Sequence, residues 1–202
     1  MSEQVELGLG AVVALDTAGR ACQAGVFVNG ALAAFRRVEM LHGQAEALLP
    51  MVDAVMAEAG VDYAEVRAVI ATAGPGSFTG LRVGLAAAQG LGLAIGCPVL
   101  AVSSFAAWAM DAGGAVRVAL DSRRGDAFVQ DFDAAGNPAG AAFLGAASLA
   151  QGPGTVGDLA GGVAPTLEGV FAAALRPGHR LPPLPLYLRE ADAVPQGGAP
   201  CA

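Results

Sequence analysis

The segment from Gly74 to Gly84, Gly-Pro-Gly-Ser-Phe-Thr-Gly-Leu-Arg-Val-Gly, concentrates the residue types that can do chemistry in this chain. It follows an apolar run that predicts a strand, 66–73, and opens a run that predicts a helix, 81–95. A helix N-terminus carries partial positive charge and Arg82 adds a full one, so this junction favours anions. Glycines at the same spacing also permit close helix–strand packing, so the residues leave both interpretations open.

The residues of this segment that we assign to anion or nucleotide binding are small, hydroxylated or basic: Gly74, Gly76, Ser77, Thr79, Gly80 and Arg82. The segment is not a Walker P-loop, because that motif requires a lysine and the chain contains none. It is not a nucleophile elbow either, since no serine stands in a Gly-x-Ser-x-Gly motif.

Two copies of a short motif place an acidic residue at the end of an apolar run. Residues 14–17 read Ala-Leu-Asp-Thr and residues 119–122 read Ala-Leu-Asp-Ser, and a hairpin-like pattern follows each copy. Asp16, with Thr17, and Asp121 have the oxygen ligands that Mg²⁺ and its phosphates prefer. An aspartate in a turn also accepts hydrogen bonds from its own backbone, so a structural role stays open for both. The repeated pattern predicts an internal duplication.

No metal centre is predicted. His42 stands alone, because the residue one helical turn further on is Glu46 and the other histidine, His179, lies in a proline-rich stretch. Two ligands are too few for a tight zinc site. The three widely spaced cysteines match neither a disulfide framework nor a zinc pattern.

The composition predicts a globular acidic protein. The chain has 202 residues, 54% of them hydrophobic and 14% charged, with a net charge of −7 and a pI near 4.7. Nucleic-acid binding by the chain alone is disfavoured, because it requires clustered basic charge. The N-terminus lacks the basic start of a signal peptide and no apolar run is long enough for a membrane span, so we expect a cytoplasmic protein without membrane contact.

Hydrophobic periodicity predicts an α/β protein with mixed sheets. The expected strands are 11–15, 21–28, 31–38, 66–73, 99–102, 116–120, 127–132 and 139–144, and the expected helices are 46–59, 81–95, 104–112 and 170–175. The helices 46–59 and 81–95 carry an apolar or small-residue stripe that periodicity assigns equally to a core or to an interface. The stripe residues are Leu48, Met51, Val52, Val55, Gly84 and Ala88.

The duplicated strand, Asp turn and hairpin resemble the two actin-like (ribonuclease H-like) half-domains of the actin, Hsp70 and sugar-kinase superfamily. Within it, the chain resembles the TsaB (YeaZ) family from about residue 11 to 193. The matching segments are residues 14–18, 42–52, 74–84, 119–124 and 185–193. The resemblance implies an N-terminal actin-like domain at 1–113 and a shortened C-terminal one at 114–193. The last residues, 194–202, are expected to form a disordered tail.

The resemblance implies a non-catalytic scaffold and dimerisation subunit, required for N6-threonylcarbamoyladenosine formation at position 37 of tRNAs. Such subunits pair with the catalytic TsaD paralogue, work with the TsaE ATPase, form homodimers when alone and meet tRNA only through the complex. The resemblance favours partner binding over a core position for the stripe residues. It implies no tightly bound cofactor and leaves open a weak or interface-shared nucleotide. The alternative is an M22-like peptidase or an ATP-binding hydrolase; the lone His42, the absent lysine and the short second half argue against it.

Overall fold

The computed structural model describes residues 7 and 9–188, so the expected tail at 194–202 lies outside the described residues. The elements before residue 113 are β1 (Ala11–Asp16), β2 (Ala21–Val28), β3 (Ala31–Glu39), α1 (Gln44–Ala59), β4 (Val66–Gly74), α2 (Phe78–Ile95), β5 (Val99–Ser103) and α3 (Ser104–Ala112). The later elements are β6 (Val116–Asp121), β7 (Asp126–Phe132), β8 (Phe143–Ala146), β9 (Thr155–Val156), α4 (Leu167–Leu175) and β10 (Arg180–Leu181). Single 3₁₀ turns occupy Tyr63–Glu65, Ala147–Ala150, Asp158–Ala160 and Pro177–His179.

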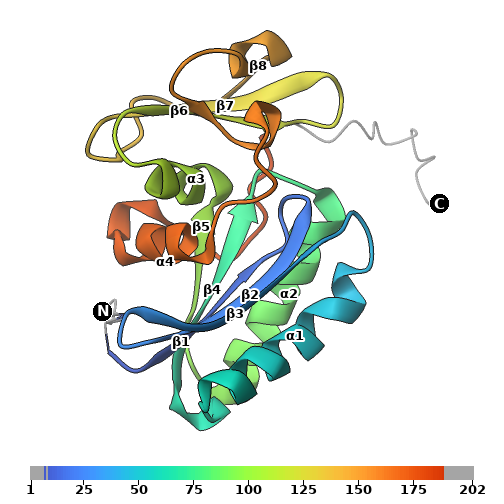
Figure 1. Cartoon of the computed structure of the whole chain (residues 1–202), viewed down its shortest axis with the longest axis vertical. Coiled ribbons are helices and arrows are strands. Elements are labelled where there is room, and N and C mark those ends of the chain that lie inside the picture. Colours follow the sequence, from blue (N-terminus) through green and yellow to red (C-terminus); the bar gives the residue numbers. More distant parts are fainter. Residues whose placement is uncertain (1–6, 8, 189–202) are drawn as a thin grey trace, which may run out of the picture.

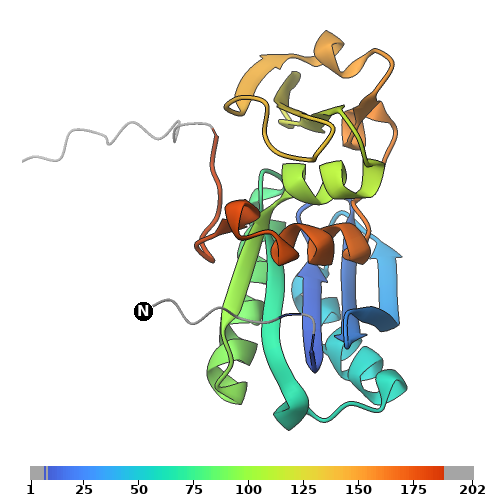
Figure 2. The ribbon, with the colours of Figure 1, turned by 90° about the vertical axis from the view of Figure 1, so that its left-hand side faces the viewer.

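The first lobe is built on a six-stranded mixed sheet in the order β10-β5-β4-β1-β2-β3. Asn29 and Gly30 both have positive φ and close the β2–β3 hairpin, as an Asn-Gly pair favours. Strands β1, β4 and β5 run parallel. Helices α1 and α2 cover one face of this sheet and α3 and α4 cover the other (Figures 1 and 2). Each face therefore has its own buried core.

The second lobe is a smaller, four-stranded sheet in the order β8-β7-β6-β9, which lies across α3 from the first (Figure 1). Helix α3 contributes to the cores of both lobes. Its Ala106 and Ala107 pack with the first sheet, and its Phe105 and Ala109 pack with β6 and β7. The fold is therefore the predicted mixed α/β arrangement with two sheets, the second of them reduced.

The element order through α3 is confirmed, but the expected strand at 139–144 is wrong: β8 spans Phe143–Ala146. Pro138 forms only an isolated bridge with Phe132, and Gly140 beyond it offers no side chain to pack, so pairing resumes later. The division at residue 113 stays a prediction. The sheets do change between α3 and β6, whereas α4 and β10 return to the first sheet.

Helix α2 is the one helix among residues 7 and 9–188 whose length and apolar composition suffice to cross a bilayer. It packs along β4 and against α1, with Leu81, Leu85 and Ala88 among its buried residues. A helix in the core of a globular domain meets the same criteria, so this observation is weak evidence for a membrane span.

Candidate functional site

The glycine-rich segment packs tightly against the β1–β2 turn. A Cβ atom added at Gly76 would collide with the Ala18 carbonyl oxygen, and one added at Gly80 would collide with that of Thr17. The Ser77 N–H donates to the Ala18 carbonyl at 2.7 Å, and the Thr17 hydroxyl donates to the Gly80 carbonyl at 2.7 Å. Close packing therefore accounts for these glycines without a ligand, while anion binding stays a prediction.

Asp16 is 1% exposed, and its carboxylate is occupied by donors from the chain itself. Oδ1 accepts hydrogen bonds from the Ala18 N–H at 3.0 Å and from the Thr72 hydroxyl. Oδ2 accepts one from Gln23 Nε2 at 2.9 Å, and the same amide group donates to the Pro165 carbonyl. A buried carboxylate with three such donors holds the β1–β2 turn in place. This arrangement supports the structural role that the sequence left open.

Asp121 caps the matching turn of the second lobe. Its Oδ1 accepts from the Arg123 N–H at 2.7 Å, and Oδ2 lies 3.9 Å from Arg123 Nε. The Asp121 N–H donates in turn to Asp158 Oδ1 at 2.7 Å. Burial raises the pKa of Asp158, whereas the hydrogen bond from the Asp121 N–H lowers it; the Asp121 charge adds to the rise, and Arg123 and Arg20 oppose it. Asp158 follows β9 in a glycine-rich stretch, where no sequence motif marked it.

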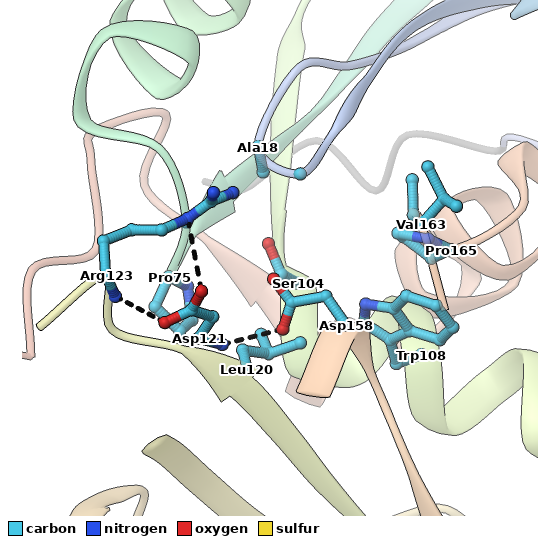
Figure 3. A pocket seen from close by; sticks show the side chains of 13 residues that line it. Ala18, Pro75, Ser104, Trp108, Leu120, Asp121, Arg123, Asp158, Val163 and Pro165 are labelled. Carbon is cyan, nitrogen blue, oxygen red and sulfur yellow. Dashed lines mark hydrogen bonds and ion pairs between the residues drawn. The ribbon is translucent and has the colours of Figure 1, made fainter. Parts of the chain in front are cut away.

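These groups line a cavity between the two lobes, shown in Figure 3. The cavity measures about 20 Å³, which is room for about one water molecule. Ser104 at the start of α3 lines it, is 3% exposed and has a hydroxyl oxygen without a hydrogen-bond partner in the described part of the chain. Trp108 and Pro165 close its far side. In this closed arrangement the cavity is too small for a nucleotide.

The remaining residues assigned to anion binding do not converge on the cavity. Ser77 caps α2 by accepting from the Gly80 N–H at 3.3 Å, and with Thr79 and His42 it lines an open hollow of about 310 Å³. Gly74, with a φ of 106°, ends β4, where a Cβ would contact Leu81. Arg82 points elsewhere, as described next. Among the described residues, no group of three or more His, Cys, Asp or Glu is placed to hold a metal ion.

The Arg82 guanidinium lies on an exposed aromatic cluster. Its carbon is 3.6 Å from the centre of the Phe78 ring, and its Nε donates to the Tyr187 hydroxyl at 3.1 Å. This contact, with the Leu186 N–H donating to the Ala73 carbonyl, ties the C-terminal segment to the start of α2. Arg82 therefore fastens the chain to itself rather than lining the cavity between the lobes.

The six stripe residues assigned to partner binding all lie inside the first lobe. Leu48, Met51, Val52, Val55, Gly84 and Ala88 are buried, with exposures between 0 and 8% for the five that carry side chains. They pack beneath α1 and α2 on the sheet, so this structure gives them no surface for a direct contact. The residues of the same helices that do reach the surface include Leu49, at 47% exposed, and Leu93, at 87%. Periodicity finds the apolar stripe of each helix but does not tell whether that stripe faces the core or a partner.

The chain is similar to one family model and to several known proteins. The family model described as TsaD, tRNA N6-adenosine threonylcarbamoyltransferase, matches residues 41–153, more than half of the chain. An uncharacterized protein of Mycobacterium tuberculosis (strain ATCC 25618 / H37Rv) is 34% identical over 198 residues, covering 91% of this chain and 94% of that protein. The protein of Escherichia coli (strain K12) named tRNA threonylcarbamoyladenosine biosynthesis protein TsaB is 35% identical over 127 residues, covering 60% and 54%.

Among solved structures, YeaZ from Pseudomonas aeruginosa superposes with a TM-score of 0.74 at 26% identity, covering 89% of this chain and all of that one. The two mixed sheets and the paired Asp turns define the actin-like α/β class. Within that class, the chain belongs to the TsaB/YeaZ family.

Proposed function

We propose that this chain is a non-catalytic subunit of the machinery that forms N6-threonylcarbamoyladenosine in tRNA. The names of its relatives support the pathway. The observation that supports a non-catalytic role is the closed cleft between the lobes. The cavity there is of water size, and the carboxylate of Asp16, two residues before the cavity residue Ala18, is filled by hydrogen bonds from the chain. An actin-like enzyme needs that space for its nucleotide.

The outer face of α1 and α2 is the surface we propose for pairing with a TsaD-family protein. Ala86 and Gly90 of α2 are exposed and small, which allows a second helix pair to approach closely. Leu49 of α1 and Leu93 of α2 add exposed apolar area to that face. Burial of such area is the main driving force of association. In the absence of a TsaD-family protein, a second copy of this chain would bind to the same face. The complex with the TsaD-family protein would work with a TsaE-type ATPase, and tRNA would bind to this complex rather than to the chain alone.

The direct experiment is reconstitution. Purified TsaD-family, TsaE-family and adenylate-forming partners from the same source are incubated with tRNA, with and without this chain, and the modified nucleoside is measured by mass spectrometry. We expect product only when the chain is present. Equal product in its absence would overturn the proposal, and ATP hydrolysis by the chain alone would point to the rival hydrolase.

Two leucines of equal exposure allow a matched test of the surface. Leu49 and Leu175 are both 47% exposed, but Leu49 lies on α1 and Leu175 at the end of α4 on the other face of the sheet. We expect Leu49→Asp to weaken binding to the TsaD-family protein at least about tenfold, since a buried unpaired charge costs more than 1.4 kcal/mol. Leu175→Asp should bind as the wild type does. Equal affinities for both variants, by calorimetry, would place the contact elsewhere.

A further inference from the structure

His179 is a buried histidine at the junction of the two lobes. It lies between α4 and β10 of the first lobe and is 6% exposed. Its ring meets the ring of Phe132, on β7 of the second lobe, edge to face with centres 6.4 Å apart. Neither ring nitrogen makes a hydrogen bond within the described part of the chain. Burial of an imidazole whose nitrogens make no hydrogen bond favours its neutral form.

A second contact joins the same two segments. Arg176, at the end of α4, donates from Nη1 to the carbonyl of Ala135 in the turn that follows β7. The turn is held in shape by Asp133, whose Oδ1 accepts from the Ala135 and Asn137 N–H groups at 2.9 Å each. We call the pairs Arg176–Ala135 and His179–Phe132 the interlobe latch. Gly136 in the same turn lies against Met110 at the end of α3, and none of the four latch residues lines the cavity that contains Asp158.

The charges on the elements around His179 offer it no counter-ion. Asp131 on β7 is paired with Arg117, at 2.7 Å. Asp133 is engaged with its own turn, and Arg180 donates from Nε to the Ala174 carbonyl. Burial lowers the pKa of His179 and the Arg176 charge lowers it further, while the Gly136 backbone opposes the shift to a smaller extent.

We propose that the interlobe latch is a pH-sensitive device: it is closed when His179 is neutral and opens when His179 takes up a proton. The cation would sit buried against the Phe132 ring and beside Arg176, while the nearby carboxylates of Asp131 and Asp133 are already engaged with other partners. Opening lets water reach the ring. The consequence is a looser junction between the second lobe and α4, while the face of α1 and α2 stays unchanged.

The direction of the pH effect follows from linkage. A lowered pKa in the closed state means that the closed state binds the proton less well than the open one. Closure is therefore fully favoured above the ordinary value of 6.5 and weakens as the pH falls below it. The weakening ends once the pH drops below the pKa of the closed state. Each unit of difference between the pKa values of His179 in the open and closed states changes the equilibrium constant for closing about tenfold.

The first measurement is the imidazole titration by NMR. The chain has only two histidines, so the signals of His179 need to be distinguished from those of His42 alone. We expect the His179 signals to titrate clearly below the ordinary value of 6.5. A His179 pKa at or above 6.5 would overturn the proposal, and this test needs no variant beyond His42→Gln to assign the signals.

The second measurement localises the effect by hydrogen exchange with mass spectrometry, comparing variants at the same pH. His179→Phe keeps a ring against Phe132 and cannot titrate; His42→Gln is the matched control. At pH 7.5 peptides that cover 132–138 and 176–180 should exchange alike in all three proteins. At pH 5.0 the wild type and His42→Gln should exchange faster than His179→Phe, by about tenfold per unit of pKa difference. Equal pH profiles for the wild type and His179→Phe would contradict the latch.

Discussion

At the scale of single residues, two glycines of α2 differ in their surroundings: one is required by close packing and the other is not. Gly80 touches the Thr17 carbonyl, whereas nothing lies within 4 Å of a Cβ placed at Gly90. We expect Gly80→Ala to destabilise the protein by about 1–3 kcal/mol, because the turn must move. Gly90→Ala should stabilise it by about 0.5–1 kcal/mol, since alanine favours the helix. Urea unfolding measures both, and effects of the same sign would contradict the packing role.

The sequence identified several residues of the site but not their partners. Asp16, Thr17 and Gly76 were found because a motif places them at strand ends, and the structure brings them together. Gln23 and Thr72, which fill the Asp16 carboxylate, lie inside strands and carry no local signal. Such contacts depend on strand register, which a single sequence does not reveal.

At the scale of elements, one carboxylate adds hydrogen bonds to the apolar packing between α3 and α4. Asp111 Oδ2 accepts from the Thr166 N–H at 2.6 Å, Oδ1 accepts from its hydroxyl, and that hydroxyl caps α4 by accepting from the Gly169 N–H at 3.1 Å. We expect Asp111→Ala to cost about 1–3 kcal/mol of folding free energy, because two donors and a cap lose their support. Asp53→Ala is the control.

Asp53 accepts a single hydrogen bond, from the exposed Tyr63 hydroxyl, so its removal should change the free energy of unfolding by less than about 1 kcal/mol. Thermal unfolding monitored by circular dichroism compares the two variants. An Asp111→Ala protein as stable as Asp53→Ala would mean that α4 docks through its apolar face alone, through residues such as Val170 and Phe171.

The helices and strands were predicted more accurately than the sheet to which the last of them belong. The order of strands and helices up to residue 112 follows from periodicity and from turn residues such as Asn29 and Gly30. The attachment of α4 and β10 to the first sheet was not predicted, because nothing in a short apolar helix or a two-residue strand specifies which sheet it joins. For the same reason, the sequence did not predict the contacts of the interlobe latch.

At the scale of the whole molecule, the two lobes are expected to unfold together. The chain passes from the first lobe to the second after α3 and returns through α4, and α3 belongs to both cores. Loss of the second sheet would expose Phe105, which is fully buried, and leave α3 half unsupported. Cooperative unfolding of a domain of this size is the norm when a core is shared in this way.

Two probes, one for each lobe, test this expectation. Trp108, the single tryptophan, packs with the core of the second sheet, and Cys22 is fully buried in the first, where burial raises its thiol pKa to about 11. In a Cys97→Ser, Cys201→Ser background, Trp108 fluorescence and Cys22 labelling should report the same urea midpoint, because a shared core melts once. A lower urea midpoint by fluorescence than by labelling would mean that the second lobe unfolds first. Repeating both measurements over a range of pH would then test the interlobe latch. If the two midpoints differ only below pH 6.5, protonation of His179 sets the order of unfolding.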